Sequence, residues 1–166
     1  MTNRSDVDLP AGAPEFRLTR VFYAPRELVY RCWMEPSHLA RWWGPKTFVC
    51  PVCEIDARAG GKFRMVMRSA DGIDFPLTGT FREIVPNVRI VKEEDTSGHP
   101  EEWHDEVDPE RKGQGKRKVG LLTTVTFEDH GAGTRVTITT RFPSLALRDS
   151  FAKTGMTEGW SSSLEK

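Results

Sequence analysis

The chain has 166 residues, which is enough for one ordinary domain with a hydrophobic core. It carries 24 Lys and Arg against 24 Asp and Glu, and this formal net charge of zero argues against a dedicated nucleic-acid-binding protein. No apolar run approaches the roughly 20 residues that a membrane-spanning helix needs. Three cysteines are too few for a disulfide scaffold, and residues 1–14 lack the apolar segment of a signal peptide, so we expect a cytoplasmic location.

The neutral total hides a strong local segregation of charge. Residues 93–110 contain nine acidic side chains and no Lys or Arg, and residues 111–118 contain five basic side chains and no acid. We expect these two runs to pair across one long, mobile strand connection with a solvated surface.

Residues 1–14 are expected to be a loose polar lead-in, and residues 15–166 a single domain. The first predicted strand is 16–23, which is rich in β-branched and aromatic residues. A short helix follows from Pro25, and a second covers 37–43.

Alternating polarity and turn residues then predict a series of antiparallel strands. They cover residues 47–56, 62–69, 73–85, 88–92, 119–127 and 135–142. A last helical segment opens after Pro143, with Phe151, Gly155, Gly159 and Trp160 on one face. The plan is α+β: a curved sheet covered by a helix.

The alternate strand positions that are predicted to face the interior carry large, adaptable side chains, and two glycines lie on the apolar face of the covering helix. Such a helix either approaches the sheet closely or leaves space beneath it. On these features alone, a packed core is favoured over a ligand pocket.

An ordered set of short motifs resembles the activator of heat-shock ATPase homologue family (AHSA-like), part of the START-like superfamily, also called SRPBCC or Bet v 1-like. The resemblance covers about residues 16–166. Its motifs are Arg20–Pro25, Trp42–Pro45, Asp56–Gly61 with Phe63, Asp71-Gly72, Gly79, Glu83-Ile84, Pro86, Arg89, Gly155-Met156, Gly159-Trp160 and Leu164.

The resemblance implies a helix-grip fold, in which a curved six- to seven-stranded antiparallel sheet wraps a long C-terminal helix and two short helices follow the first strand. It also implies an apolar cavity between sheet and long helix, which shifts the balance toward a pocket. Two departures from the family pattern are Asn87 after Pro86 and the long connection between residues 92 and 119.

The leading hypothesis is a non-enzymatic protein that binds a small hydrophobic molecule, lipid-like or polyketide-like, without a cofactor or metal. The expected cavity residues are Trp43, Phe48, Phe63, Met65, Met67, Phe75, Phe81, Glu83, Trp103, Phe127, Met156 and Trp160. The alternatives are a cyclase or hydrolase of a hydrophobic substrate, and a co-chaperone-like partner of a heat-shock ATPase. A homodimer through an exposed sheet edge stays open.

The sequence contains no hydrolase elbow, zinc-protease motif or phosphate loop. The enzyme alternative therefore depends on Glu83, which shares strand parity with Phe81 and would face inward beside Arg20. A structural ion pair, or a bulge that turns Glu83 outward, is the favoured reading of the same residues.

Two other clusters are weighed as redox or metal sites. Cys50 and Cys53 lie three apart in a predicted strand, so they should point to opposite faces with Cα atoms about 10 Å apart, and only a bulge at Pro51 would bring them together. His99 and His104 lie among acidic residues in the charged connection. Ordinary thiols and a solvated surface are favoured over redox or metal chemistry.

Overall fold

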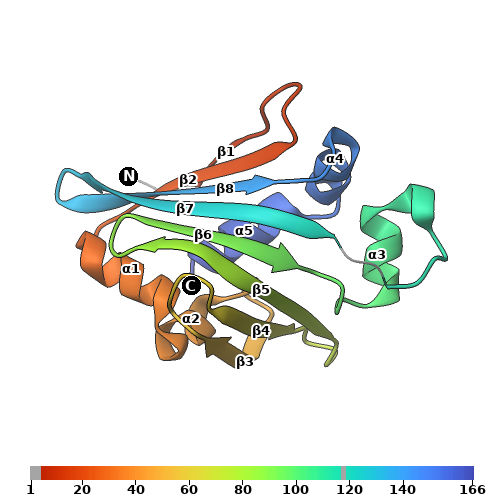
Figure 1. Cartoon of the computed structure of the whole chain (residues 1–166), viewed down its shortest axis with the longest axis horizontal. Helices are drawn as coiled ribbons and strands as arrows, with labels where there is room; N and C mark the ends of the chain where they lie inside the picture. The colour runs from red at the N-terminus through yellow and green to blue at the C-terminus, as the bar shows by residue number, and fades with distance from the viewer. Residues whose placement is uncertain (1–4, 117–118) are drawn as a thin grey trace.

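A computed structural model describes residues 5–116 and 119–166. The described chain forms one eight-stranded sheet with every pairing antiparallel, in the order β1-β2-β8-β7-β6-β5-β4-β3 (Figure 1). The strands are β1 (Asp6–Asp8), β2 (Glu15–Phe22), β3 (Val49–Ile55), β4 (Lys62–Arg68), β5 (Asp74–Val85), β6 (Arg89–Asp95), β7 (Gly120–His130) and β8 (Gly133–Arg141).

Alternating polarity builds these strands as predicted. In β4, Phe63 and Met65 are buried while Lys62 and Arg64 are exposed, which gives the sheet one apolar face. The helices α1 (Arg26–Met34) and α2 (Pro36–Trp42) follow the first long strand. The apolar face packs against these helices and the C-terminal helices, and the core lies between them.

The strand count differs from the expected six or seven. The additional strand is β1, which pairs with β2 through Val7 opposite Leu18, within the segment expected to be a loose lead-in. The three residues Asp-Val-Asp are too few to show a period, although Val7 packs against the core, so the sequence pattern does not reveal this strand. Residues 1–4 of that lead-in lie outside the described residues.

The expected long C-terminal helix is two short ones, α4 (Leu145–Lys153) and α5 (Met156–Leu164). Gly155 interrupts them with φ of +93°, a left-handed conformation that favours glycine. The helical period continues across this residue, so the pattern of apolar side chains predicted one helix where the backbone makes two.

Two β-bulges change which face the following residues occupy. One lies in β3 between Val49 and Val52, and the other lies in β5 between Phe81 and Glu83. A bulge inserts one residue and shifts the parity by one, so expectations based on strict alternation fail beyond it. Cys50 and Cys53 consequently both pack against the core, which corrects their expected placement on opposite faces.

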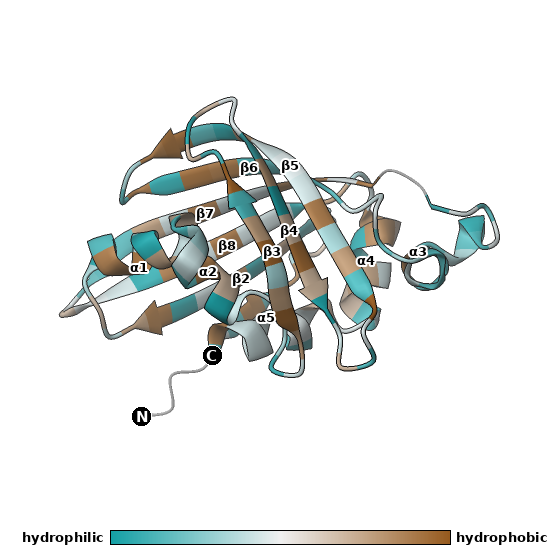
Figure 2. Cartoon of the chain, turned by 90° about the horizontal axis from the view of Figure 1, so that it is seen from below, coloured by the Kyte–Doolittle hydropathy of each residue, from teal (hydrophilic) through white to brown (hydrophobic). Residues whose placement is uncertain are grey.

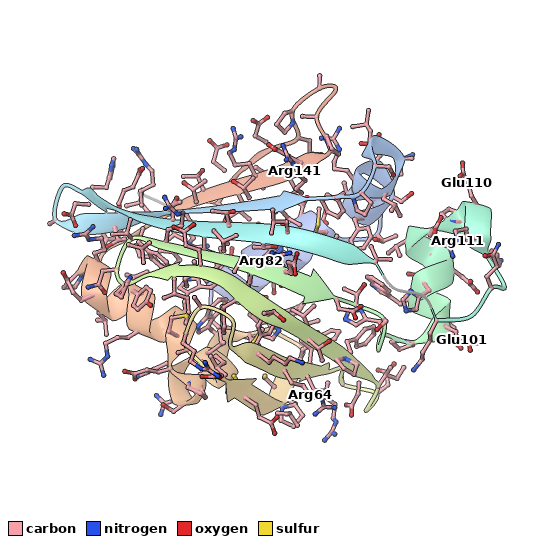
Figure 3. The ribbon with its side chains drawn as sticks, viewed as in Figure 1. Arg64, Arg82, Glu101, Glu110, Arg111 and Arg141 are labelled. Atoms are coloured by element: carbon pink, nitrogen blue, oxygen red, sulfur yellow. The ribbon has the colours of Figure 1, made fainter. Side chains whose placement is uncertain are left out.

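The acidic connection is structured rather than an open solvated loop. It contains the helix α3 (Glu101–Val107) and the short 3₁₀ helix η1 (Pro109–Arg111), at the far end of the molecule from α1 (Figure 1). His104 and Val107 are fully buried, and the Trp103 ring lies 5.3 Å from the Phe151 ring of α4. The apolar side of this helix packs on α4, while the labelled charges Glu101, Glu110 and Arg111 lie together at this end (Figure 3).

Among the described residues, the ion pair found between the acidic and the basic run joins two side chains that are close in sequence. Arg111 lies 4.0 Å from Asp108, one helical turn away. The basic residues at positions 117 and 118 lie outside the described residues. The labelled Arg64, Arg82 and Arg141 project from the sheet, and Arg82 and Arg141 pair with Glu93 and Glu15 (Figure 3).

Candidate functional site

A pocket of about 360 Å³ lies between the sheet and the C-terminal helices. Figure 2 shows α5 beneath the curved sheet, with α3 and α4 beside it at one end. The apolar lining residues are Trp43, Pro45, Phe48, Met67, Phe75, Leu77, Trp103, Leu121, Phe151, Met156 and Trp160. A small, mostly apolar concavity with a few polar groups is typical of a small-molecule site.

The two glycines of the covering helices leave room in this pocket. A Cβ atom added at Gly159 would meet only Pro45, at 3.8 Å, and one added at Gly155 would meet only Glu158, at 4.0 Å. Both glycines line the pocket. Of the two readings offered for them, space beneath the helix is the one this geometry supports.

Seven of the residues expected at the cavity do line this pocket: Trp43, Phe48, Met67, Phe75, Trp103, Met156 and Trp160. Of the adjacent pair, Trp43 faces the pocket, while Trp42 packs on Trp33 and donates its indole N–H to the Cys32 carbonyl at 2.8 Å. Four others, Phe63, Met65, Phe81 and Phe127, are buried core residues outside the pocket lining.

Glu83 does not face the pocket, which corrects its expected place among the cavity residues and agrees with the favoured reading of a bulge that turns it outward. The bulge after Phe81 places it beside Arg89, whose Nε donates to Glu83 Oε1 at 3.2 Å, and both side chains are more than 40% exposed. Arg20 instead donates to the Ser5 hydroxyl at 3.4 Å. Glu83 and Arg20, on which an enzyme reading depended, therefore interact with different partners, and neither lines the pocket.

A buried polar cluster lies along the inner face of β6, and sequence reasoning missed it. Lys92 Nζ lies 3.7 Å from Glu94 Oε2, and the Thr123 hydroxyl donates to Glu94 and lies 3.0 Å from the Thr140 hydroxyl. Glu94 and Thr140 line the pocket. The signal was present, because the alternation that starts at the buried Ile90 continues through Lys92 and Glu94.

Lys92 is enclosed by aromatic rings as well as by its carboxylate partner. Its Nζ lies 5.0 Å from the Trp43 ring centroid, 5.4 Å from Phe63 and 5.9 Å from Trp33. Cation–π attraction to three ring faces helps to offset the loss of water around the ammonium group.

Thr96 and His99 add polar atoms to the pocket lining. Both side chains are buried, and neither the Thr96 hydroxyl nor either ring nitrogen of His99 has a hydrogen-bond partner among the described residues. Burial, reinforced by the nearby His104, lowers the pKa of His99 to about 4. His99 is therefore neutral at pH 7 and offers one donor and one acceptor.

A second, wider hollow of about 990 Å³ lies over β3–β7 and is lined largely by polar and charged side chains, among them Lys62, Arg64 and Glu93. Its lining carries less apolar character than the inner pocket, which makes the inner pocket the better candidate for an apolar molecule. Across the described ranges no group of three or more His, Cys, Asp or Glu is arranged to hold a metal ion. No helix in those ranges is long and apolar enough to cross a bilayer.

Comparison with known proteins identifies similar sequences and folds. Residues 23–166 match the sequence model of the family described as "Activator of Hsp90 ATPase homolog 1-like protein". A crystal structure from Chromobacterium violaceum is 29% identical, with a TM-score of 0.70 over 91% of this chain and 92% of that one. None of the curated proteins compared with the chain matches it.

Two further structures show the same fold. A solution structure from Arthrobacter aurescens is 25% identical, with a TM-score of 0.78 over 96% of this chain and 87% of that one. The AHSA1 protein from Silicibacter pomeroyi is 20% identical, with a TM-score of 0.68 over 91% and 92% of the two chains.

Proposed function

The chain belongs to the activator of Hsp90 ATPase homolog 1-like family, and from that premise we propose that it binds a small hydrophobic molecule in the pocket beneath α5. The proposed ligand class is lipid-like or polyketide-like, with an apolar body. The observation that carries the proposal is the pocket of about 360 Å³ with aromatic and methionine walls.

The composition of the walls supports binding rather than plain core packing. Trp43 and Trp160 meet edge to face with centroids 5.5 Å apart, and Phe48 and Phe75 lie 5.7 Å apart on another side of the pocket. These rings offer large apolar area with few rotatable bonds, so little conformational entropy is lost when a ligand is held between them.

The test is a fluorescence titration with N-phenyl-1-naphthylamine, a neutral apolar probe, together with native mass spectrometry of the purified protein. The decisive variant is Gly159→Leu, which places a large side chain in the pocket from a helical position where only Pro45 lies within 4 Å of an added Cβ atom. Its matched control is Glu158→Leu, which adds the same side chain at an exposed position of the same helix outside the pocket lining.

We expect saturable probe binding by the wild-type protein and by Glu158→Leu, and at least tenfold weaker binding by Gly159→Leu. Circular dichroism and thermal unfolding check that the variants are folded. A wild-type protein that binds neither the probe nor a co-purified ligand would remove the proposal. Equal binding by Gly159→Leu would place any bound probe elsewhere.

The second candidate is a co-chaperone-like partner of a heat-shock ATPase, which the family description favours. It predicts that saturating amounts of this protein change the steady-state rate of an Hsp90-type ATPase. An unchanged rate would reject it, and the probe titration does not depend on that outcome.

A further inference from the structure

Cys50 and Cys53 lie on the same face of the strand at the edge of the sheet. β3 is the last strand in the sheet order, and its bulge between Val49 and Val52 turns both cysteines toward the inner face. Cys53 lies opposite Met65 of β4. The side chains of Cys50 and Cys53 both pack against the core and are partly exposed. Each thiol shifts the pKa of the other, as expected for two side chains that lie near one another.

The bulge removes the geometric objection to pairing. In a regular strand, residues three apart have Cα atoms about 10 Å apart and side chains on opposite faces, which forbids a disulfide. Pro51 cannot donate a backbone hydrogen bond to the strand pairing, so it suits a bulge position at an edge strand. Within the bulge, the Cys50 thiol donates a hydrogen bond to the Val52 carbonyl oxygen, with Sγ and O 3.2 Å apart.

The two thiols are also electrostatically different. Hydrogen bonding from Cys53 and the charge of Lys166 lower the pKa of Cys50. The pKa of Cys53 is raised by its interaction with Cys50 and by burial. Lys166 is held close by, donating from Nζ to the Phe48 carbonyl at 3.0 Å. Lys92 is the other cation that acts on the pair, on the Cys53 side. One thiol is thereby suited to attack and the other to resolve.

We infer that Cys50 and Cys53 are a reversible redox site, which closes to an intrachain disulfide by exchange with a low-molecular-weight disulfide of the glutathione class. The Cys50 thiolate attacks one sulfur of the small disulfide, which forms a mixed disulfide and releases one thiolate. Cys53 then gives its proton to a released thiolate and attacks the Cys50 sulfur, which expels the second thiolate. The two cysteines lose two electrons and the small disulfide gains them.

The order of the steps follows from the pair itself. The interactions that raise the pKa of Cys53 come chiefly from the Cys50 thiolate. Once Cys50 is bonded to the small thiol, that negative charge is gone, and Cys53 loses its proton more readily. Attack by Cys50 therefore prepares Cys53 for the second step.

The test oxidises the full chain with glutathione disulfide, traps free thiols with N-ethylmaleimide and analyses tryptic peptides by mass. Cleavage after Lys46 and Arg58 places both cysteines in peptide 47–58, while Cys32 falls in peptide 32–41. We expect peptide 47–58 to lose two hydrogen atoms and take no maleimide, and dithiothreitol to restore two maleimide adducts. Cys32 serves as the internal reference.

Two isosteric variants separate the steps. Cys53→Ser should accumulate a mixed disulfide with glutathione at Cys50, which the wild type resolves to the intrachain disulfide, and Cys50→Ser should form no intrachain disulfide in this peptide. Wild-type peptide 47–58 that keeps two free thiols at an excess of glutathione disulfide would overturn the inference, as would oxidation that stops at a mixed disulfide. The wild-type measurement needs no variant to fold, and it is independent of any ligand in the pocket.

Discussion

Lys92 and Glu94 form an ion pair inside the protein, with Nζ and Oε2 3.7 Å apart and both side chains only 6% exposed. Removing one partner of such a pair leaves an uncompensated buried charge, which typically costs about 3–5 kcal/mol. Replacing both partners with apolar side chains avoids that cost. The pair therefore makes the inner face of β6 sensitive to single changes and tolerant of a double one.

We expect Glu94→Leu to lower the free energy of unfolding by about 3–5 kcal/mol, because Lys92 would lose its carboxylate partner while still buried among the rings of Trp33, Trp43 and Phe63. The double variant Lys92→Met with Glu94→Leu should recover most of this loss. Urea unfolding of the wild type, both single variants and the double variant measures the coupling. Additive losses would show that the two side chains do not stabilise each other.

Acid should destabilise the protein through His99. Its pKa is about 4 in the folded state, below the ordinary value of 6.5, so the unfolded chain binds the proton first. The stability due to neutral His99 is complete above pH 6.5 and is lost as the pH falls toward 4, by about 3 kcal/mol in total. The other groups that act on this ring are His104, Asp95 and Lys116.

The measurement compares the wild type with His99→Phe by urea unfolding between pH 4 and 7. Carboxylates titrate in both proteins, so the informative quantity is the difference between the two stabilities. That difference should shift in favour of the variant as the pH falls. A difference that stays constant across this range would contradict the low pKa of His99.

The two glycines of the C-terminal segment should respond to alanine with opposite signs. Gly155→Ala places a Cβ atom on a residue with φ of +93°, which we expect to lower stability by about 1 kcal/mol. Gly159→Ala improves helix propensity with only Pro45 nearby, at 3.8 Å, and should raise stability by up to about 1 kcal/mol. Thermal unfolding of both variants decides the matter, and changes of the same sign would contradict the break between α4 and α5.

Glu83 should be dispensable. Its pair with Arg89 is more than 40% exposed on both sides, and exposed pairs typically contribute less than about 1 kcal/mol. We expect Glu83→Gln to unfold within about 1 kcal/mol of the wild type and to bind the naphthylamine probe with unchanged affinity. A tenfold loss of probe affinity would return Glu83 to the pocket.

Local patterns in the sequence determined much of the fold. Strand β4 was predicted to within one residue, and the two short helices after the first long strand were placed to within one residue at most ends, because side-chain period and turn residues act over a few positions. Seven of the residues that were expected at a cavity, among them Trp43, Met67 and Trp160, lie in the lining of the pocket, although the cavity itself was implied by the family resemblance and not by these patterns. The same patterns also placed Gly155 and Gly159 on the apolar face of the last helical segment, but left open whether that helix approaches the sheet closely or leaves space beneath it.

Only the tertiary structure decided the rest, because it depends on partners far away in the chain. The bulges in β3 and β5 shift the parity by one residue, which brings Cys50 to Cys53 and turns Glu83 away from the pocket. Lys92 and Glu94 are buried as an ion pair, and Glu94 also accepts a hydrogen bond from the hydroxyl of Thr123 on the neighbouring strand. Each of these charges therefore depends on its partners for its burial. A charge pattern along one chain segment does not specify such partners, so the acidic run was expected to be solvated although part of it lines the pocket.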